Sequence, residues 1–175
     1  WENNKILQIH KSIIDNPEAN CFLHWEEYNR INRKPVTLRH GDKYFRPDKP
    51  VLGQLYMKNF LSTSALVCEN SLIKNVGGFD NTLPNAQDYD LWLKMANKMR
   101  LKIIPLVLGE YTEQSNSITS RPYYKRIWAE IRIAFRYKNH VPVLTFVYKT
   151  LKIVFSIQWI YTLYNLFTGN QRHGL

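Results

Sequence analysis

Residues 86–108, AQDYDLWLKMANKMRLKIIPLVL, decide the fold class, because they run from a helix pattern directly into a strand pattern. On a helical wheel of about 100° per residue, the apolar side chains between Leu91 and Met99 form one arc, which predicts a helix over residues 88–99. Residues 101–108 are a short apolar run of the kind that forms a buried strand. A helix followed by a buried strand is typical of α/β proteins.

The sequence before this stretch repeats the same alternation. Spacing and apolar runs predict helices over residues 2–15 and 50–59 and a short one ending at Ile73, with strands over residues 21–25 and 60–68. Residues 29–50 contain three prolines and Gly41, so we expect a long surface loop there. Two further helices, over residues 123–139 and 143–167, are predicted to close the chain.

The composition is that of a globular protein. The chain has 175 residues, of which 45% are apolar and 14% aromatic, which excludes a disordered or collagen-like chain and allows a domain of ordinary size. Two cysteines, Cys21 and Cys68, are too few for a disulfide framework and lack the spacing of a metal site. The five histidines are scattered, so no metal-ligand set is predicted.

The positive charge is concentrated in the last third of the chain. The net charge is +10, yet residues 121–175 hold nine basic side chains against one acid, Glu130, and residues 1–120 are nearly neutral. Such a basic segment is typical of contact with nucleic acid, with anionic lipid or with water alone.

Two aspartates begin the predicted helix, and the wheel separates them. Asp88 falls near the centre of the apolar arc, whereas Asp90 falls on the opposite side with Lys94 as an ion-pair partner four residues later. We therefore expect Asp90 at the surface and Asp88 directed inward. A carboxylate at position 88 fits either a first-turn acid stabilised by free N–H groups or a general base beside a cleft, and spacing leaves both open.

Several stretches resemble, in the same order, the second half of a family 2 glycosyltransferase. The family pattern is a Thr-Ser strand, a GGFD turn and an ED-x-DLWLR helix start. This sequence has FLSTSALV at 60–67, VGGFD at 76–80 and QDYDLWLK at 87–94. LGEY at 108–111 and NSIT at 116–119 are similar to the segment that closes the family's domain. The resemblance covers about residues 1–120.

The resemblance implies a partial GT-A domain, Rossmann-like with a mixed sheet, followed by C-terminal helices. It implies that Asp88 is the base that deprotonates the acceptor hydroxyl during inverting sugar transfer. Each other candidate for acceptor contact has a structural alternative. Ser62, Thr63 and Ser64 are also ordinary strand residues, Gly77 and Gly78 ordinary turn glycines, and Trp92, which could stack on a sugar, an ordinary core residue.

Three departures from the family pattern affect the supporting residues. Gln87 replaces a glutamate beside the base, and Lys94 replaces an arginine. Gln114 stands where many relatives have a histidine, so we expect it to donate a hydrogen bond and give it no metal role. The family's uridine-binding strand and its DxD motif, which binds Mg²⁺ or Mn²⁺, are expected upstream of Trp1, so this chain alone is expected to be inactive.

The basic tail, residues 121–175, is predicted to be amphipathic. Thr145, Lys149, Lys152 and Ser156 form a narrow polar stripe, while Trp159, Tyr161 and Tyr164 suit the lipid headgroup level. Packing of these helices on their own domain is the structural alternative, and the absence of a known nucleic-acid motif in the sequence argues against nucleic acid.

The sequence therefore predicts the acceptor-side half of a peripheral glycosyltransferase at the cytoplasmic face of the inner membrane. Its expected partners are a nucleotide-sugar donor, a glycan or lipid-linked acceptor of bacterial surface polysaccharide, and the anionic membrane surface. The alternative from another class is a non-catalytic peripheral-membrane or interaction module, derived from such an enzyme without its activity.

Overall fold

The computed structural model describes residues 1–113, 123–156, 163–164 and 167. The chain forms two compact units. The first comprises Trp1–Asn81 with Gln87–Ser117, and the second comprises Thr82–Ala86 with Ile118–Leu175.

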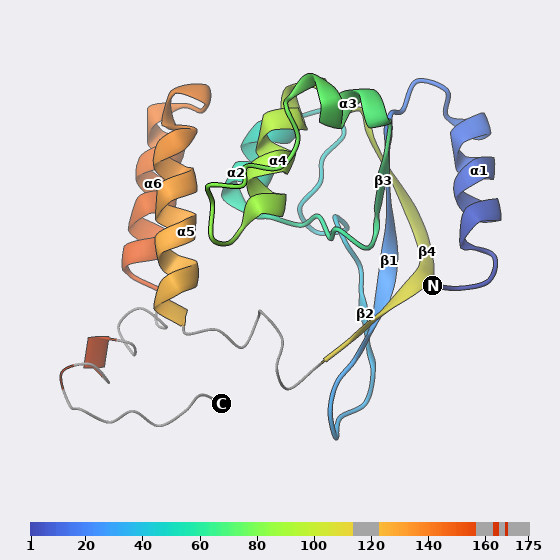
Figure 1. Ribbon diagram of the computed structural model, residues 1–175, viewed down its shortest axis with the longest axis horizontal. Coiled ribbons are helices and arrows are strands. Elements are labelled where there is room, and N and C mark those ends of the chain that lie inside the picture. The colour runs from blue at the N-terminus through green and yellow to red at the C-terminus, as the bar shows by residue number, and fades with distance from the viewer. Residues whose placement is uncertain (114–122, 157–162, 165–166, 168–175) are drawn as a thin grey trace. The chain divides into compact units, whose positions relative to one another are not determined.

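The first unit is built on a mixed four-stranded sheet (Figure 1). Its central strand β1 (Cys21–Asn29) pairs antiparallel with the short strands β2 (Val36–Leu38) and β3 (Leu66–Cys68). Strand β4 (Leu101–Thr112) runs parallel to β1 along its whole length. A long apolar strand at the centre and a parallel neighbour confirm the predicted α/β class.

Helices cover both faces of this sheet (Figure 1). Helix α1 (Lys5–Asp15) lies on one face, where its Ile9 packs with Phe22, Ile104 and Leu108. On the other face lie three helices: α2 (Val51–Met57), α3 (Asn70–Asn75) and α4 (Gln87–Met95). A 3₁₀ turn, η1 (Ala96–Lys98), leads from α4 toward β4.

Helix α4 is enclosed by protein on almost every side. Six of its nine residues are buried: Tyr89, Asp90, Leu91, Trp92, Leu93 and Met95. The Tyr89 hydroxyl donates to the carbonyl oxygens of Leu55 and Tyr56, each 3.0 Å away, and so ties α4 to the end of α2. The helical wheel predicted that one side of α4 meets solvent, whereas the helix lies in the core.

Two expectations about the strands and loops were wrong. The strand expected over residues 60–68 is limited to β3, because residues 62–66 form a turn in which the Ser62 carbonyl accepts from the N–H groups of Ala65 and Leu66. The loop expected over residues 29–50 contains β2, which forms a hairpin with the end of β1.

The described part of the second unit includes two helices and a connecting turn. Helix α5 (Tyr123–Arg136) is followed by the 3₁₀ turn η3 (Lys138–His140) and by helix α6 (Val143–Val154). The rings of Phe135 and Phe146 meet edge to face at 5.2 Å between the two helices. Helix α6 ends well before residue 167, where the sequence predicted its end, and Trp159 and Tyr161 lie outside the described residues. Among the described helices, none has both the length and the apolarity that a membrane crossing requires.

Gly41 is a sensitive position in this fold. Its φ is +79°, which L side chains rarely adopt, and an added Cβ would lie 2.6 Å from Cδ1 of Ile103. Gly41→Ala is therefore expected to lower the free energy of unfolding by about 1–3 kcal/mol, measured by urea denaturation.

Gly53 provides the matched control. It lies inside α2 with no atom within 4 Å of an added Cβ, so Gly53→Ala is expected to stabilise the protein by up to about 1 kcal/mol. Equal effects of the two substitutions would contradict this account of the backbone.

Candidate functional site

A buried carboxylate, Glu26, organises the α1 side of the sheet. It lies on β1 and is only 1% exposed. It accepts hydrogen bonds from Ser62 Oγ at 2.8 Å and Ser64 Oγ at 2.5 Å, and its Oε2 lies 2.9 Å from His40 Nε2. We call Lys5, Glu26, His40, Ser62 and Ser64 the Glu26 cluster.

The partners of Glu26 keep it ionised. Burial alone would raise the pKa of this carboxyl, but the hydrogen bonds from His40, Ser64 and Ser62 outweigh burial and lower the pKa to about 2. Glu26 therefore carries a negative charge inside the protein across the physiological pH range.

Lys5 connects the cluster to the first helix. Its buried Nζ donates to the Ser64 carbonyl oxygen at 3.0 Å and lies 4.0 Å from the ring centroid of Trp1. Burial lowers the pKa of Lys5, and the charge of Glu26 opposes that change. The cluster therefore joins four segments: the start of α1, strand β1, the loop after β2 and the turn before β3.

The predicted acceptor segment is thus held in place by Glu26. The hydroxyls of Ser62 and Ser64 are directed to the carboxylate, while Thr63 between them is exposed. Thr63 lines a pocket of about 310 Å³ whose other walls are mainly apolar side chains of α1 and β3. Thr63 and Ser64 are both exposed, and of the two only Ser64 bonds to Glu26.

The paired glycines have a clear structural role. Gly77 and Gly78 have φ values of +79° and +70°, and their N–H groups bond to the carbonyl oxygens of Lys74 and Ile73 at the end of α3. An added Cβ at either position would meet no atom within 4 Å. The positive φ values therefore favour the turn interpretation of these glycines.

The expected position of Asp90 was wrong. Asp90 is fully buried, not at the surface, because α4 is enclosed in the core. Its predicted partner is confirmed: Lys94 Nζ lies 3.2 Å from Asp90 Oδ2 and also donates to the Gly78 carbonyl oxygen at 3.2 Å. Asp88 lies in the first turn of α4 and is half-buried, and its Oδ1 accepts from the Tyr89 N–H at 2.8 Å.

Trp92 is only 4% exposed, which favours the core alternative over stacking on a sugar. Gln87 begins α4 and is half-buried, while Gln114 lies outside the described residues. The predicted residues thus lie in two groups. Ser62 and Ser64 donate to the Glu26 carboxylate, whereas Gly78 and Asp90 both contact the Lys94 ammonium group.

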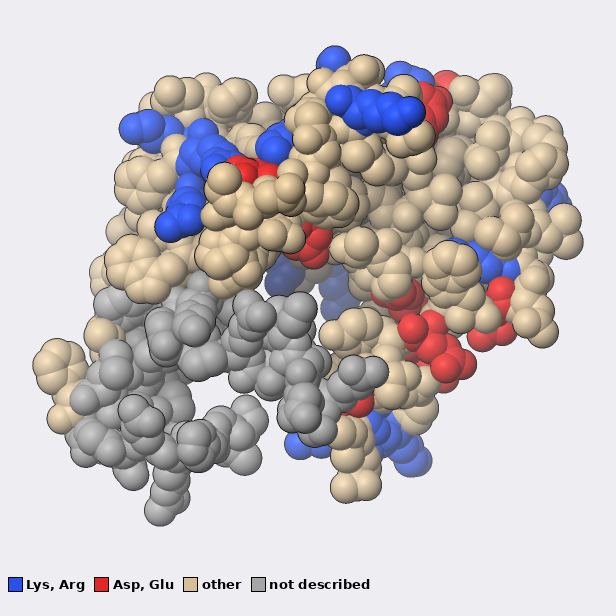
Figure 2. Space-filling view, viewed as in Figure 1, with Lys and Arg blue, Asp and Glu red and all other residues tan. Residues whose placement is uncertain are grey.

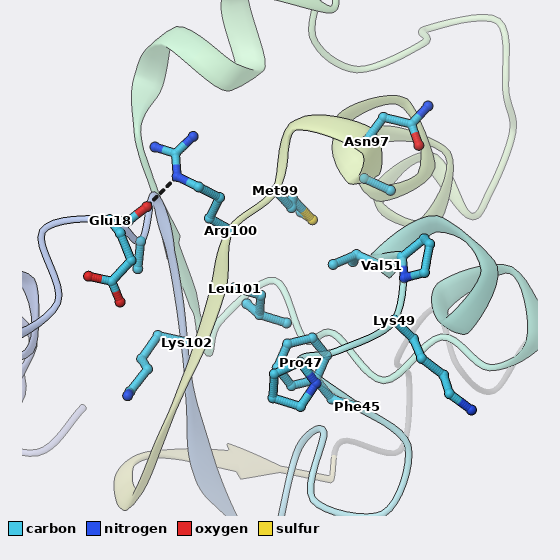
Figure 3. A pocket seen from close by; sticks show the side chains of 13 residues that line it. Glu18, Phe45, Pro47, Lys49, Val51, Asn97, Met99, Arg100, Leu101 and Lys102 are labelled. Carbon is cyan, nitrogen blue, oxygen red and sulfur yellow. Dashed lines mark hydrogen bonds between the residues drawn. The ribbon is translucent and has the colours of Figure 1, made fainter.

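A second pocket, of about 400 Å³, lies where β4 begins (Figure 3). Phe45, Val51 and Met99 contribute apolar walls, and Lys49 and Lys102 lie at its rim. Arg100 also lines it and donates from Nε to the carbonyl oxygen of Glu18. Ligands of α/β sheets usually bind at the carboxyl ends of the strands, so this pocket lies at the opposite edge.

Comparison with known proteins supports a glycosyltransferase-like role. The chain is 31% identical over 70 residues to the pre-mycofactocin glycosyltransferase of Mycobacterium tuberculosis, in strains CDC 1551 / Oshkosh and ATCC 25618 / H37Rv. The match covers 38% of this chain and 15% of that relative's length. No family model matches the sequence.

The sequence analysis missed Glu26, Lys5 and His40. One signal was available, namely the acidic pair Glu26–Glu27 at the end of an apolar strand, where a buried acid requires partners. The partners themselves lie 14 to 38 residues away along the chain, so spacing could not identify them.

Removing the charge of Glu26 is expected to destabilise the fold. Glu26→Gln keeps the shape but should cost about 2 kcal/mol at pH 7, because hydrogen bonds to a charged group contribute about 1.5–3 kcal/mol. The folded-state pKa of about 2 lies below the ordinary 4.5, so this stabilisation is present above pH 4.5 and is lost as the pH falls toward 2. Urea denaturation at several pH values measures the difference.

Glu27→Gln is the matched control on the same strand. Glu27 is half-buried, so its substitution should change the free energy of unfolding by less than about 0.5 kcal/mol. A Glu26 effect that equals the Glu27 effect, or that does not shrink in acid, would contradict the role of the cluster.

Proposed function

We propose that this chain is the acceptor-side half of an inverting family 2 glycosyltransferase, with a GT-A fold in residues 1–120. The 31% identity over 70 residues to a glycosyltransferase carries this proposal. The order of the FLSTSALV, VGGFD and QDYDLWLK stretches supports the family assignment. The reaction would move a sugar from a nucleotide-sugar donor to a glycan acceptor.

Asp88 is the general base of this proposal. It lies in the first turn of α4 and is partly accessible, whereas the neighbouring Asp90 is buried and paired with Lys94. A sugar hydroxyl is a poor nucleophile, so a base must remove its proton as the oxygen attacks the anomeric carbon. Inversion places this attack on the face opposite the departing nucleoside diphosphate.

The acceptor would lie against the segments that surround this base. Thr63 is an exposed residue of the predicted Ser62–Ser64 segment, and the two serines position it through Glu26. Gly77 and Gly78 would offer backbone without side chains, and Gln87 and Gln114 would supply neutral hydrogen-bond donors. Asp90 supports the site by holding Lys94 against the Gly78 carbonyl oxygen.

The nucleotide and its metal would be held by residues outside this chain. The described residues contain no group of three His, Cys, Asp or Glu side chains that could hold a metal ion. They therefore do not fit the Mg²⁺ or Mn²⁺ that such enzymes use, and no step is assigned to a metal here. Helix α1 exposes four large apolar side chains, Ile6, Leu7, Ile13 and Ile14, which would suit packing against the missing half.

The cellular setting belongs to the same proposal. A peripheral position at the cytoplasmic face of the inner membrane would place the enzyme near a lipid-linked acceptor of surface polysaccharide. The basic segment 121–175 would supply the attraction to anionic lipid, with no role in nucleic-acid binding.

A non-catalytic interaction module is the second candidate. It is favoured by the lack of a metal-ligand group among the described residues and by the short stretch of similarity, 15% of the relative's length. In such a module Asp88 would only stabilise the start of α4.

Substitution of the base distinguishes these functions. In the complete enzyme that contains this chain, Asp88→Asn is expected to lower kcat by about 10²–10⁴-fold while donor binding stays unchanged, because proton removal alone is lost. Sugar transfer and donor titration provide the two measurements. Asp48→Asn, on the exposed loop before α2, is the charge-matched control and should retain activity. Full transfer by the Asp88→Asn enzyme would leave Asp88 as a first-turn acid only.

A further inference from the structure

Helix α6 has its apolar side on the outside. On the wheel, one half of the helix consists of apolar residues with Lys152 at its edge. The structure exposes these apolar residues: Val143 (74%), Leu144 (83%), Val147 (43%), Tyr148 (58%), Leu151 (50%), Val154 (40%) and Phe155 (67%). We call these seven residues the α6 apolar face.

The opposite half of α6 is largely polar, yet it is the half that packs on α5. Lys149 is 6% exposed, and Thr145, Thr150 and Ser156 are half-buried beside Ile153. Burial lowers the pKa of Lys149 to about 8, against the opposing charge of Glu130 on α5. A helix packed on its own domain in water normally has the reverse orientation, with polar residues outside.

The unit that contains the α6 apolar face is cationic. Arg132, Arg136, Lys138 and Lys152 are exposed on α5, η3 and α6, with Lys152 at the edge of the apolar face, and Glu130 is the one acid between residues 121 and 175. Figure 2 shows blue basic side chains among tan ones over these helices. Trp128 (67% exposed) and Phe155 add aromatic rings of the kind found at the level of lipid headgroups.

From this arrangement we infer that α6 lies flat in the headgroup region of an anionic bilayer, with the α6 apolar face toward the acyl chains. This inference deepens the peripheral location in the proposed function and assigns the contact to one helix face. The twelve residues of α6 extend about 18 Å, less than the roughly 30 Å of a bilayer core, so the helix would lie along the surface. Anionic lipid, unlike neutral lipid or a basic protein, complements Lys152 at the edge of this face and the other exposed cations of the unit.

Vesicle co-sedimentation of the full 175-residue chain tests the inference. Binding is expected with vesicles of phosphatidylcholine and phosphatidylglycerol, and much weaker binding with phosphatidylcholine alone. The double variant Leu144→Ser, Leu151→Ser should reduce the partition constant at least about tenfold, because it removes two leucine side chains that would insert among the acyl chains. Lys152→Gln should reduce it about fivefold.

A double variant on α1 is the matched control. Ile6 and Leu7 are 69% and 66% exposed, so Ile6→Ser, Leu7→Ser removes similar apolar surface without a change of charge, and it should bind as the unmodified chain does. Circular dichroism would check that both double variants keep their helices. The inference is overturned by an equal loss from both pairs, by no binding at low salt, or by sedimentation velocity showing a dimer that only the α6 pair disrupts.

The outcome is independent of the catalytic proposal. Vesicle binding needs no sugar transfer, and Asp88→Asn should leave it unchanged because Asp88 lies in the first unit. Failure to bind vesicles would remove the membrane contact but not the transferase role, and loss of the transferase role would leave the vesicle result standing.

Discussion

The burial of one ionised carboxylate, Glu26, sets the arrangement of the whole α1 side of the sheet. A charge inside a protein is costly unless hydrogen bonds satisfy it, and three side chains from distant segments do so here. Meeting this requirement brings the loop after β2 and the turn before β3 against the central strand. Through the Ser64 carbonyl oxygen it also fixes Lys5 and the start of α1.

Local patterns predicted the order of helices and strands, because apolar spacing reports which segments enter the core. These patterns were less successful in predicting which side of each helix meets solvent. Asp90 was expected at the surface since the wheel assumes that one side of α4 meets water, yet neighbouring elements enclose the helix. The Glu26 cluster was missed because its hydrogen bonds depend on tertiary contacts across 14 to 38 residues, which no local period encodes.

Helices α1 and α6 share an unusual distribution of buried and exposed side chains. Each buries a lysine, Lys5 or Lys149, and each exposes several large aliphatic side chains. Burying an ammonium group opposes folding, and exposing Leu or Ile forfeits the stabilisation that burial would contribute. The free-energy cost of these exposed apolar side chains would be reduced if the outer faces of both helices met apolar surroundings in the assembled protein. For α1 those surroundings would be further protein, and for α6 they would be lipid.

Asp88 and Asp90 differ in their partners: Asp90 is paired with a lysine, whereas Asp88 is not paired with that lysine. Lys94 neutralises Asp90 inside the core and spans to the Gly78 carbonyl oxygen, so this pair joins α4 to the glycine turn after α3. The Asp90 carboxylate is therefore occupied by a structural contact inside the protein. Asp88 lies two residues earlier and is half-buried, and the ion pair of Lys94 is with Asp90 rather than with Asp88. The enclosed aspartate therefore positions the helix, and Asp88 is the partly accessible carboxylate to which the proposed function assigns proton transfer.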